Sequence, residues 1–237
     1  MKRALTALAL LVALAPLAAR AQSSIVAQIA GDKAATEKLY FSLKFGLNFS
    51  YLTGSPEEAG RTGNFNAGLS ATIRLNDKLS LVPEVTPFFR RGVSGIPFDT
   101  TGDPALDPAF EGPDVSSALA LDYLDVPILL RYRLGRFHVG AGPYVSFLIS
   151  AKESFRSELE TGETVRYGRE VTDQYNKTDF GLVVEGSWTV AKPRRGVGLV
   201  LHGRYEHGFV DVLKTAAPSG ALRNSVWHFY VSFPFVY

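Results

Sequence analysis

The sequence predicts an all-β protein, an eight-stranded antiparallel up-and-down transmembrane β-barrel preceded by a cleaved signal peptide. Three observations lead to this prediction. Apolar and polar residues alternate without a break from Phe41 to Tyr51, the same period of two recurs in seven later segments, and the connections between segments alternate between short and long. Because a strand places successive side chains on opposite faces, each segment has one apolar and one polar face.

The first segment, residues 41–51, shows the pattern most clearly. Its odd positions are apolar, and its even positions carry Ser42, Lys44, Gly46, Asn48 and Ser50. Soluble strands usually contain about 5 to 6 residues, whereas a tilted strand that crosses a bilayer needs about 9 to 11. The length of the alternating run therefore favours a strand that spans a membrane.

Seven further segments show the same alternation: residues 65–75, 79–90, 121–134, 137–149, 179–190, 197–206 and 227–237. In the third of these eight strands, Pro83 and Pro87 lack a ladder donor. A closed barrel requires the first strand to pair with the last.

The connections differ in length on the two sides of the predicted barrel. The short ones are residues 76–78, 134–136 and 191–196, and the long ones are residues 52–64, 91–118, 150–178 and 209–225. Short periplasmic turns, long extracellular loops and an even strand number are typical of outer-membrane barrels. Both termini then lie in the periplasm. Segment 150–178 keeps strand-like alternation on either side of residues 160–163, which predicts a hairpin that extends beyond the membrane. The sequence assigns no role to the long loops 91–118 and 150–178.

Residues 1–21 have the pattern of a secretory signal peptide. Lys2 and Arg3 precede an apolar run over residues 4–18, and a small-x-small site follows at residues 19–21. An N-terminal membrane anchor is the alternative, but the run is shorter than the roughly 20 residues that a spanning helix needs, and it contains Pro16. Residues 22–39 then form a short lead-in, and residues 40–237 form the barrel domain.

The composition excludes several classes of function. The chain has 25 basic and 23 acidic residues, and removal of Lys2, Arg3 and Arg20 with the signal peptide leaves 22 basic against 23 acidic. This balance gives no indication of a nucleic-acid partner. The chain has no cysteine, so it has neither disulfides nor thiolate metal sites.

The polar faces are rich in Gly, Ser, Asn and Thr, whereas a soluble sandwich or lipocalin-like barrel, the alternative fold, would show many Lys and Glu there. Small side chains suit the narrow lumen of eight strands. The charges on these faces compensate one another and predict an ionic network in the lumen: Lys44, Arg74, Glu84, Asp125, Arg131, Arg133, Asp179, Glu185, Arg204 and Glu206. Lys44 needs an acidic partner, for which Glu84, Asp125, Glu185 and Glu206 are the candidates.

Outward aromatic residues are expected in two girdles at the membrane interfaces. The periplasmic girdle comprises Phe41, Tyr132, Phe137, Trp188 and Tyr237. The extracellular girdle comprises Tyr51, Phe65, Phe89, Phe147, Phe180, Tyr205 and Trp227.

The histidines are the strongest candidates for chemistry. His138, His202 and His228 are expected to be polar lumen residues, and His207 with Asp211 at the outer end of the seventh strand is the best-placed pair for general-base work. No second acid or serine is placed beside that pair by the sequence, and four scattered histidines match no metal-ligand spacing. We therefore expect no catalytic, cofactor or metal site.

Five stretches carry a family resemblance: FSLKFGLN at 41–48, LSLVPE at 79–84, YLDVPILLRY at 123–132, GAGPYVS at 140–146 and TDFG at 178–181. In order and content they resemble the PorT-like outer-membrane β-barrel family of the Bacteroidetes and related bacteria. The resemblance covers residues 40–237. It implies an eight-stranded outer-membrane barrel, and the association of the named family member with protein secretion implies a secretion role as one option.

Three functional hypotheses follow. The chain is a non-enzymatic barrel with a filled lumen that acts through its extracellular loops or as an envelope component, an accessory component of a secretion machine, or a rim-active enzyme or narrow transporter. The expected location is the outer membrane of a Gram-negative bacterium. The expected partners are outer-membrane lipid and envelope or secretion-machine proteins, and the barrel is expected to be monomeric.

Overall fold

The computed structural model describes residues 38–54, 60–96, 98, 100–101, 103–110, 115–158, 162–192, 196–215 and 220–236. The predicted signal peptide, nearly all of the lead-in and Tyr237 lie outside these residues. No helix among the described residues is long and apolar enough to cross a membrane.

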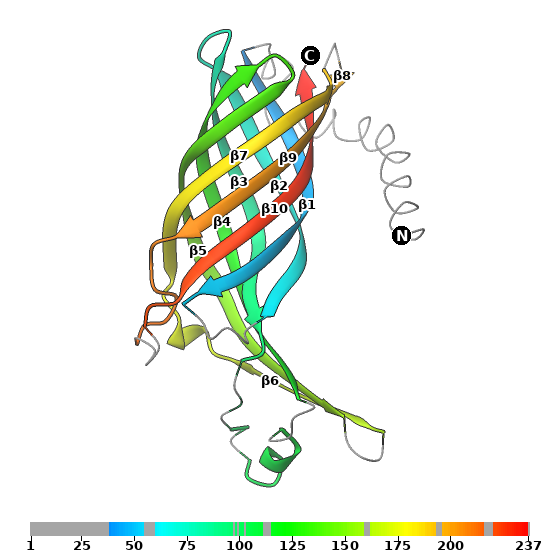
Figure 1. The fold of residues 1–237 in the computed structure, drawn as a ribbon, viewed down its shortest axis with the longest axis vertical. Helices are drawn as coiled ribbons and strands as arrows, with labels where there is room; N and C mark the ends of the chain where they lie inside the picture. Colours follow the sequence, from blue (N-terminus) through cyan, green and yellow to red (C-terminus); the bar gives the residue numbers. More distant parts are fainter. Residues whose placement is uncertain are drawn as a thin grey trace.

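Eight strands form the wall of a barrel (Figure 1): β1 (Leu39–Thr53), β2 (Gly60–Arg74), β3 (Leu79–Ser94), β4 (Ser116–Leu134), β5 (Phe137–Glu158), β7 (Thr178–Ala191), β9 (Leu199–Gly208) and β10 (Arg223–Val236). Each pairs antiparallel with its neighbour along the chain. β1 also pairs with β10, from Phe41 opposite Phe235 to Thr53 opposite Arg223, which closes the sheet. The predicted eight-stranded antiparallel barrel is confirmed.

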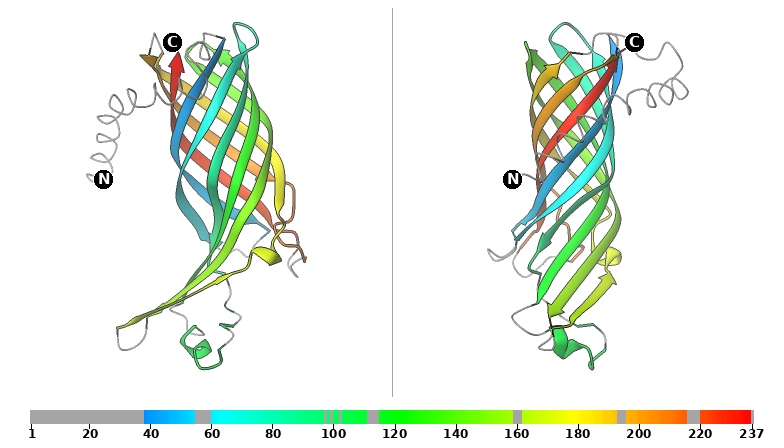
Figure 2. Two further views of the ribbon diagram at one scale, coloured as in Figure 1. Left: turned by 180° about the vertical axis from the view of Figure 1, so that it is seen from behind. Right: turned by 90° about the vertical axis from the view of Figure 1, so that its right-hand side faces the viewer.

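The two ends of the barrel differ in construction (Figure 2). At one end, which we call the turn end, the connections after β2 and β4 are short, and the two-residue strand β8 (Gly196–Val197) pairs with the last residues of β10. At the other, the loop end, β5 continues beyond the barrel and pairs with β6 (Thr164–Glu170). The predicted hairpin is therefore present. Two short 3-10 helices also belong to the loop end, η1 (Asp107–Phe110) and η2 (Thr172–Gln174).

Large apolar side chains are exposed on the outer face of every barrel strand, for example Phe65 on β2, Leu182 on β7 and Phe229 on β10. Monomeric soluble proteins rarely expose a continuous apolar surface of this extent. A belt of outward apolar residues is, however, what a barrel presents to lipid. The outer face is therefore built for a bilayer.

A β-bulge in β3 changes which residues face inward. The register between β3 and β4 shifts between Thr86 and Phe89, and Phe88 adopts a positive φ of 52°. Because side chains alternate with a period of two, one extra residue reverses the faces of everything that follows. Phe88 is 67% exposed on the outer face, and Phe89 is 1% exposed on the inner face. The prediction that Phe89 belongs to the outer girdle was therefore wrong.

Candidate functional site

The lumen holds a group of charged side chains nearer the turn end, which we call the turn-side ion cluster: Lys44, Glu84, Arg131, Glu185 and Arg204. The Lys44 ammonium donates to Glu84 at 2.5 Å. The Arg204 guanidinium donates to both Glu84 and Glu185 at 2.7 Å, and Arg131 donates to Glu185 at 2.8 Å. Each acid is thus shared between cations from different strands, so the cluster ties together the walls of the barrel.

Three further side chains complete the turn-side ion cluster. The Tyr230 hydroxyl accepts a hydrogen bond from Arg204 at 2.7 Å and donates one to Glu185. The His202 ring stacks on Tyr230 with centroids 4.2 Å apart, and its nitrogens lie 3.1 Å from Glu185 and 2.7 Å from the Ser232 hydroxyl. Buried carboxylates are tolerated where their remaining lone pairs find such donors.

A second group lies nearer the loop end, and we call it the loop-side ion cluster: Arg91, Asp125, Asp179 and Glu206. Arg91 is fully buried and donates to Asp125 at 2.7 Å, to Asp179 at 2.9 Å and to Glu206 at 3.2 Å. Glu206 also lies 3.5 Å from Arg204. This ion pair connects the two clusters into one network along the lumen.

Aromatic and amide side chains surround the Arg91 guanidinium. It lies over the rings of Tyr144, at 4.8 Å, and Tyr123, at 5.0 Å. The Tyr144 hydroxyl and the Asn224 amide both donate to Asp179, at 3.0 and 2.9 Å. The planar guanidinium suits such a site because it stacks on rings while its edges donate to several acids.

Eight of the ten predicted network residues belong to these two clusters. The other two, Arg74 and Arg133, do not, and the prediction was wrong for them. Arg74 is exposed at the turn end and lies 5.6 Å from the ring centre of Tyr40, while the exposed Arg133 donates to the backbone oxygen of Asp77. Strand ends put long cationic side chains within reach of water, so these arginines need no buried acid.

Sequence reasoning missed Arg91 and the roles of Tyr144, Asn224 and Tyr230. Alternation alone places Tyr144 and Tyr230 on the inner faces of β5 and β10, so a search for inward tyrosines would have found them. Arg91 carries no such signal. Simple alternation from Leu79 places Arg90 inside, and only the bulge at Phe88 brings Arg91 inward instead.

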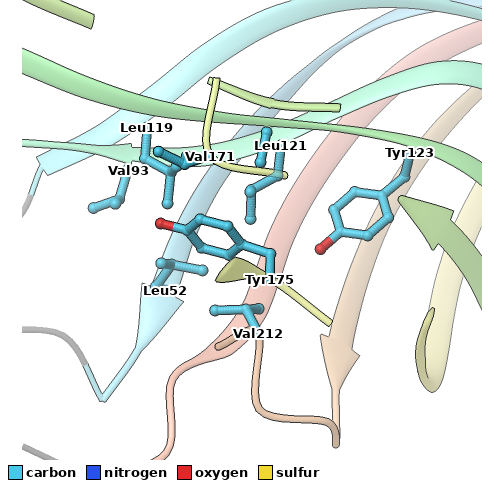
Figure 3. Close-up of a cluster of buried hydrophobic side chains, with 9 residues drawn as sticks. Leu52, Val93, Leu119, Leu121, Tyr123, Val171, Tyr175 and Val212 are labelled. Atoms are coloured by element: carbon cyan, nitrogen blue, oxygen red, sulfur yellow. The ribbon is translucent and has the colours of Figure 1, made fainter. Parts of the chain in front are cut away.

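The mouth of the barrel at the loop end is filled by an apolar cluster that we call the cap (Figure 3): Leu52, Val93, Leu119, Leu121, Tyr123, Ala151, Val171, Tyr175 and Val212. Most come from the inner faces of β1, β3, β4 and β5. Val171 and Tyr175 come from the connection between β6 and β7, and Val212 comes from the connection between β9 and β10. The sequence could not place the cap, because alternation says nothing about how connections fold back.

Backbone hydrogen bonds hold the two connections together beyond the adjacent strands β7 and β9. Tyr175 forms a β-bridge with Leu213, and the Asn176 amide donates to the Val212 oxygen at 2.9 Å. The Asp211 carboxylate accepts from the backbone amides of Leu213 and Leu222 at 3.1 and 3.2 Å. The connections are therefore an integral part of the closed end.

The structure does not bring His207 and Asp211 together. The Asp211 carboxylate serves its own loop, while His207 Nδ1 lies 3.0 Å from the Ser225 hydroxyl on the outer face. The predicted lumen histidines His202 and His228 are buried inside the barrel. Across the described ranges, no group of three or more His, Cys, Asp or Glu side chains is arranged to hold a metal ion.

Beyond the barrel, the β5–β6 hairpin and the β3–β4 connection pack against each other, and we call this unit the loop module. The Phe155 ring lies 5.3 Å from Phe98 and 6.3 Å from Tyr167, and the Tyr167 hydroxyl donates to the Thr101 oxygen at 2.8 Å. Within the connection, hydrogen bonds from the side chain and backbone of Thr101 hold the pKa of Asp107 below its ordinary value. The described part of the β3–β4 connection is thus held by its own hydrogen bonds and by contacts with the hairpin.

The remaining girdle residues follow the outward pattern. Phe137, Tyr132 and Trp188 are exposed near the turn end, and Phe137 is the register partner of Trp188. Nearer the loop end the exposed residues are Phe65, Phe147, Phe180 and Trp227. Phe41, Tyr51 and Tyr205 are partly exposed. Interfacial aromatic rings combine an apolar body with, in Tyr and Trp, a polar edge, which matches these positions.

A family model described as "Outer membrane protein beta-barrel domain" matches residues 21–214. Solved structures with a similar fold include Ail, the attachment invasion locus protein of Yersinia pestis, with a TM-score of 0.40, 10% identity and coverage of 83% of this chain and 97% of that chain. OprG from Pseudomonas aeruginosa has a TM-score of 0.37, 12% identity and coverage of 86% and 99%. AlkL, determined in DMPC bilayers, has a TM-score of 0.44, 11% identity and coverage of 87% and 94%. No curated protein matches the sequence.

Proposed function

Because this chain belongs to the outer membrane protein beta-barrel domain family, we propose that it is a closed, non-enzymatic outer-membrane barrel whose loop end binds a partner at the cell surface. In this proposal residues 1–21 are a signal peptide, both ends of the barrel domain lie in the periplasm, and the loop end faces outward. The short turns and long connections of the two ends support this orientation.

The filled lumen supports a barrel that does not conduct. The largest fully buried side chains of the described residues include Arg91, Arg204, Lys44 and Tyr123, all of which point inward, and the cap covers the mouth above them. An eight-stranded barrel is only wide enough for its own side chains. Steady ion currents through the reconstituted protein in planar bilayers would contradict the closed lumen.

The observation that carries the binding role is the loop module. Besides its ring contacts, it contains an ion pair of 2.7 Å between Arg169 and Glu153, and Arg169 also donates to the Thr100 oxygen. Its outer face presents Arg156 directly opposite Arg166. Like charges in this arrangement weaken a hairpin. A structured surface that keeps such a pair exposed is suited to recognition rather than to simple connection.

The secretion-accessory role implied by the PorT-like resemblance places the partner on the opposite side, at the periplasmic turns. A rim-active enzyme would need a general base near an acid, but His207 and Asp211 have separate partners. A narrow transporter would need a path past the ion clusters and the cap. We therefore rank surface binding first and the secretion role second.

Site-specific photo-crosslinking in intact cells distinguishes the two sides. One variant carries a photoreactive residue at position 166, in the loop module, and a matched variant carries it at position 78, in the β2–β3 turn. Arg166 and Lys78 are both exposed and lie at opposite ends of the barrel. We expect specific crosslinks from the Arg166 position. Crosslinks from Lys78 alone would reject surface binding in favour of a periplasmic assembly, and crosslinks from neither position would reject both roles.

A further inference from the structure

The outer face of the barrel carries a row of polar residues just beyond the apolar belt at the loop end, which we call the rim patch: Arg61, Tyr51, Ser225, His207 and Arg223. Tyr51 is the register partner of Ser225, and Ser225 is the register partner of His207. Arg61 extends the row onto β2, and Arg223 follows Ser225 on the same face of β10. The patch therefore crosses four adjacent strands, in the order β2, β1, β10 and β9.

Side-chain contacts join several members of the rim patch, and Arg223 is the register partner of Thr53 at its edge. The Arg61 guanidinium lies 5.3 Å from the ring centre of Tyr51. The Ser225 hydroxyl lies 2.7 Å from that of Thr53 and 3.0 Å from His207 Nδ1. Tyr51 reaches Tyr205 on β9 through their hydroxyls, 3.4 Å apart. Ser225 itself is fully buried beneath these neighbours. The outer surface of the rim patch is therefore formed by the side chains of Arg61, Arg223, Tyr51 and His207, away from both ion clusters.

The patch lies at the depth of lipid head groups. Trp227 and Phe229 follow Arg223 and Ser225 along β10, on the same outward side of the strand, and the Trp227 ring lies 4.9 Å from that of Tyr205. Because a strand rises about 3.3 Å per residue, Arg223 is about 13 Å along the tilted strand from Trp227. Tryptophan and tyrosine mark the interface between hydrocarbon and head groups. Arg61 and Arg223 therefore lie on the head-group side of the interface marked by these aromatic residues.

Among the described residues, the arginines of the rim patch differ from Arg90, on the other side of the rim, in whether an acid pairs with them. There, Arg90 on β3 donates two hydrogen bonds to Asp122 on β4, at 2.6 and 2.8 Å, and Lys152 on β5 is the register partner of Glu170 on β6. Within the described part of the chain, no carboxylate lies within 4.0 Å of Arg61 or Arg223. Arg90 therefore has a carboxylate partner, whereas Arg61 and Arg223 have none among the residues that the structure describes.

We propose that the rim patch binds the phosphate-bearing head group of a membrane lipid, with Arg61 and Arg223 contacting the phosphate and the hydroxyls of Tyr51 and Thr53 adding hydrogen bonds. Guanidinium groups match phosphate oxygens with paired donors. Cationic side chains next to a membrane attract anionic lipids. Placement of this lipid in the outer leaflet rests on the orientation proposed above, but binding to lipid phosphate does not, since head groups of both leaflets carry phosphate.

Lipid titration of the purified full-length protein in neutral detergent tests this proposal. The probes are phosphatidylglycerol, diacylglycerol, which has no phosphate, and inorganic phosphate, and native mass spectrometry counts the bound molecules. We expect selective binding of phosphatidylglycerol that weakens at least about tenfold in the Arg61→Gln/Arg223→Gln variant, because this variant removes both guanidinium groups that donate to the phosphate. Arg223→Gln alone should give a smaller loss.

Arg90→Gln is the matched control, because Arg90 lies on the same rim but already has Asp122 as its partner. It should leave phosphatidylglycerol binding unchanged, and heat-modifiable migration on a gel should show every variant to be folded. Equal binding of diacylglycerol, or an equal loss in Arg90→Gln, would overturn the proposal. Competition by inorganic phosphate at the same concentration would reduce the patch to an ion site. Loss of lipid binding with unchanged crosslinks from Arg166 would leave surface recognition intact.

Discussion

The ion clusters and the cap occupy the same lumen, yet one is charged and the other is apolar. The change from a charged to an apolar interior accompanies the opposite change on the outer face of the barrel. Where Phe147 and Ile149 of β5 are exposed on the outer face, the inner face carries Ser146 and the ions; further along, Lys152 is outside and Ala151 and Phe155 are buried. The barrel therefore has its apolar side outward within the membrane and inward beyond it, as a soluble sheet does.

Irregularities in β3 and β5 let the same alternating sequence pattern fit both the membrane region and the region beyond it. In β3 the odd residue Val85 is exposed on the outer face, but after the bulge at Phe88 the odd residue Val93 lies in the cap. In β5 the register leaves out Ile149, between Leu148 and Ser150. Odd positions before this irregularity face outward, and Ala151 after it faces inward. A bulge at the membrane boundary thus reverses the polarity of a strand without a change in the alternation itself.

The largest effect is expected from Arg91→Ala, which removes the only cation that contacts Asp125 and Asp179 among the described residues. Loss of one partner of a buried ion pair costs about 3 to 5 kcal/mol, because the remaining charges stay buried. Urea unfolding in detergent micelles, followed by tryptophan fluorescence, measures the loss. Arg90→Ala, one residue away and half exposed, should cost no more than about 1 kcal/mol. Similar losses in both variants would show that burial does not separate the two arginines.

A smaller and more local effect is expected from Tyr175→Ala in the cap. Removal of a buried ring costs about 3 kcal/mol. Because the cap depends on two connections rather than on the closed sheet, the loss should appear as local opening. Hydrogen exchange should accelerate at the amides of Asn176 and Val212, but not at those of the barrel strands around Arg204. Tyr175→Phe keeps the ring and should preserve protection. Uniform acceleration along the strands would mean that the cap and the ion clusters unfold as one unit.

The smallest effect concerns the bulge that separates the two regions. Phe88 has a positive φ that disfavours residues with a Cβ atom. Phe88→Gly and Phe88→Ala lose the same outward ring, so their difference isolates the backbone strain, and we expect the glycine variant to be more stable by about 1 kcal/mol. At Phe65, which lies in regular strand β2, the order should reverse. Equal stabilities at position 88 would show that the bulge is not strained.

The sequence predicted the barrel and most of the ion clusters for the same reason. Within the membrane each strand alternates regularly. Residues such as Lys44, Glu84 and Arg204 could therefore be assigned to the lumen from their odd or even position in the alternation (their parity) alone. Parity fails at Phe89 and Arg91, because a bulge depends on local backbone geometry that the alternation does not reveal. It also fails for Tyr175 and Val212, whose burial depends on how two connections meet. The rim patch was not predicted as a unit, because Arg61, Ser225 and Arg223 fall in loops of the predicted map and Tyr51 and His207 fall at strand ends.

The pairing of β1 with β10 also has a consequence for folding. Phe41 and Phe235 lie at opposite ends of the barrel sequence, so their contact closes the longest chain loop in the sheet and carries the largest entropic cost. The hairpins between neighbouring strands form at much shorter separations. We therefore expect the seam between β1 and β10 to form last, with both edges unpaired until then. A cell that makes this protein must keep two long strand edges from pairing with other chains until the seam closes.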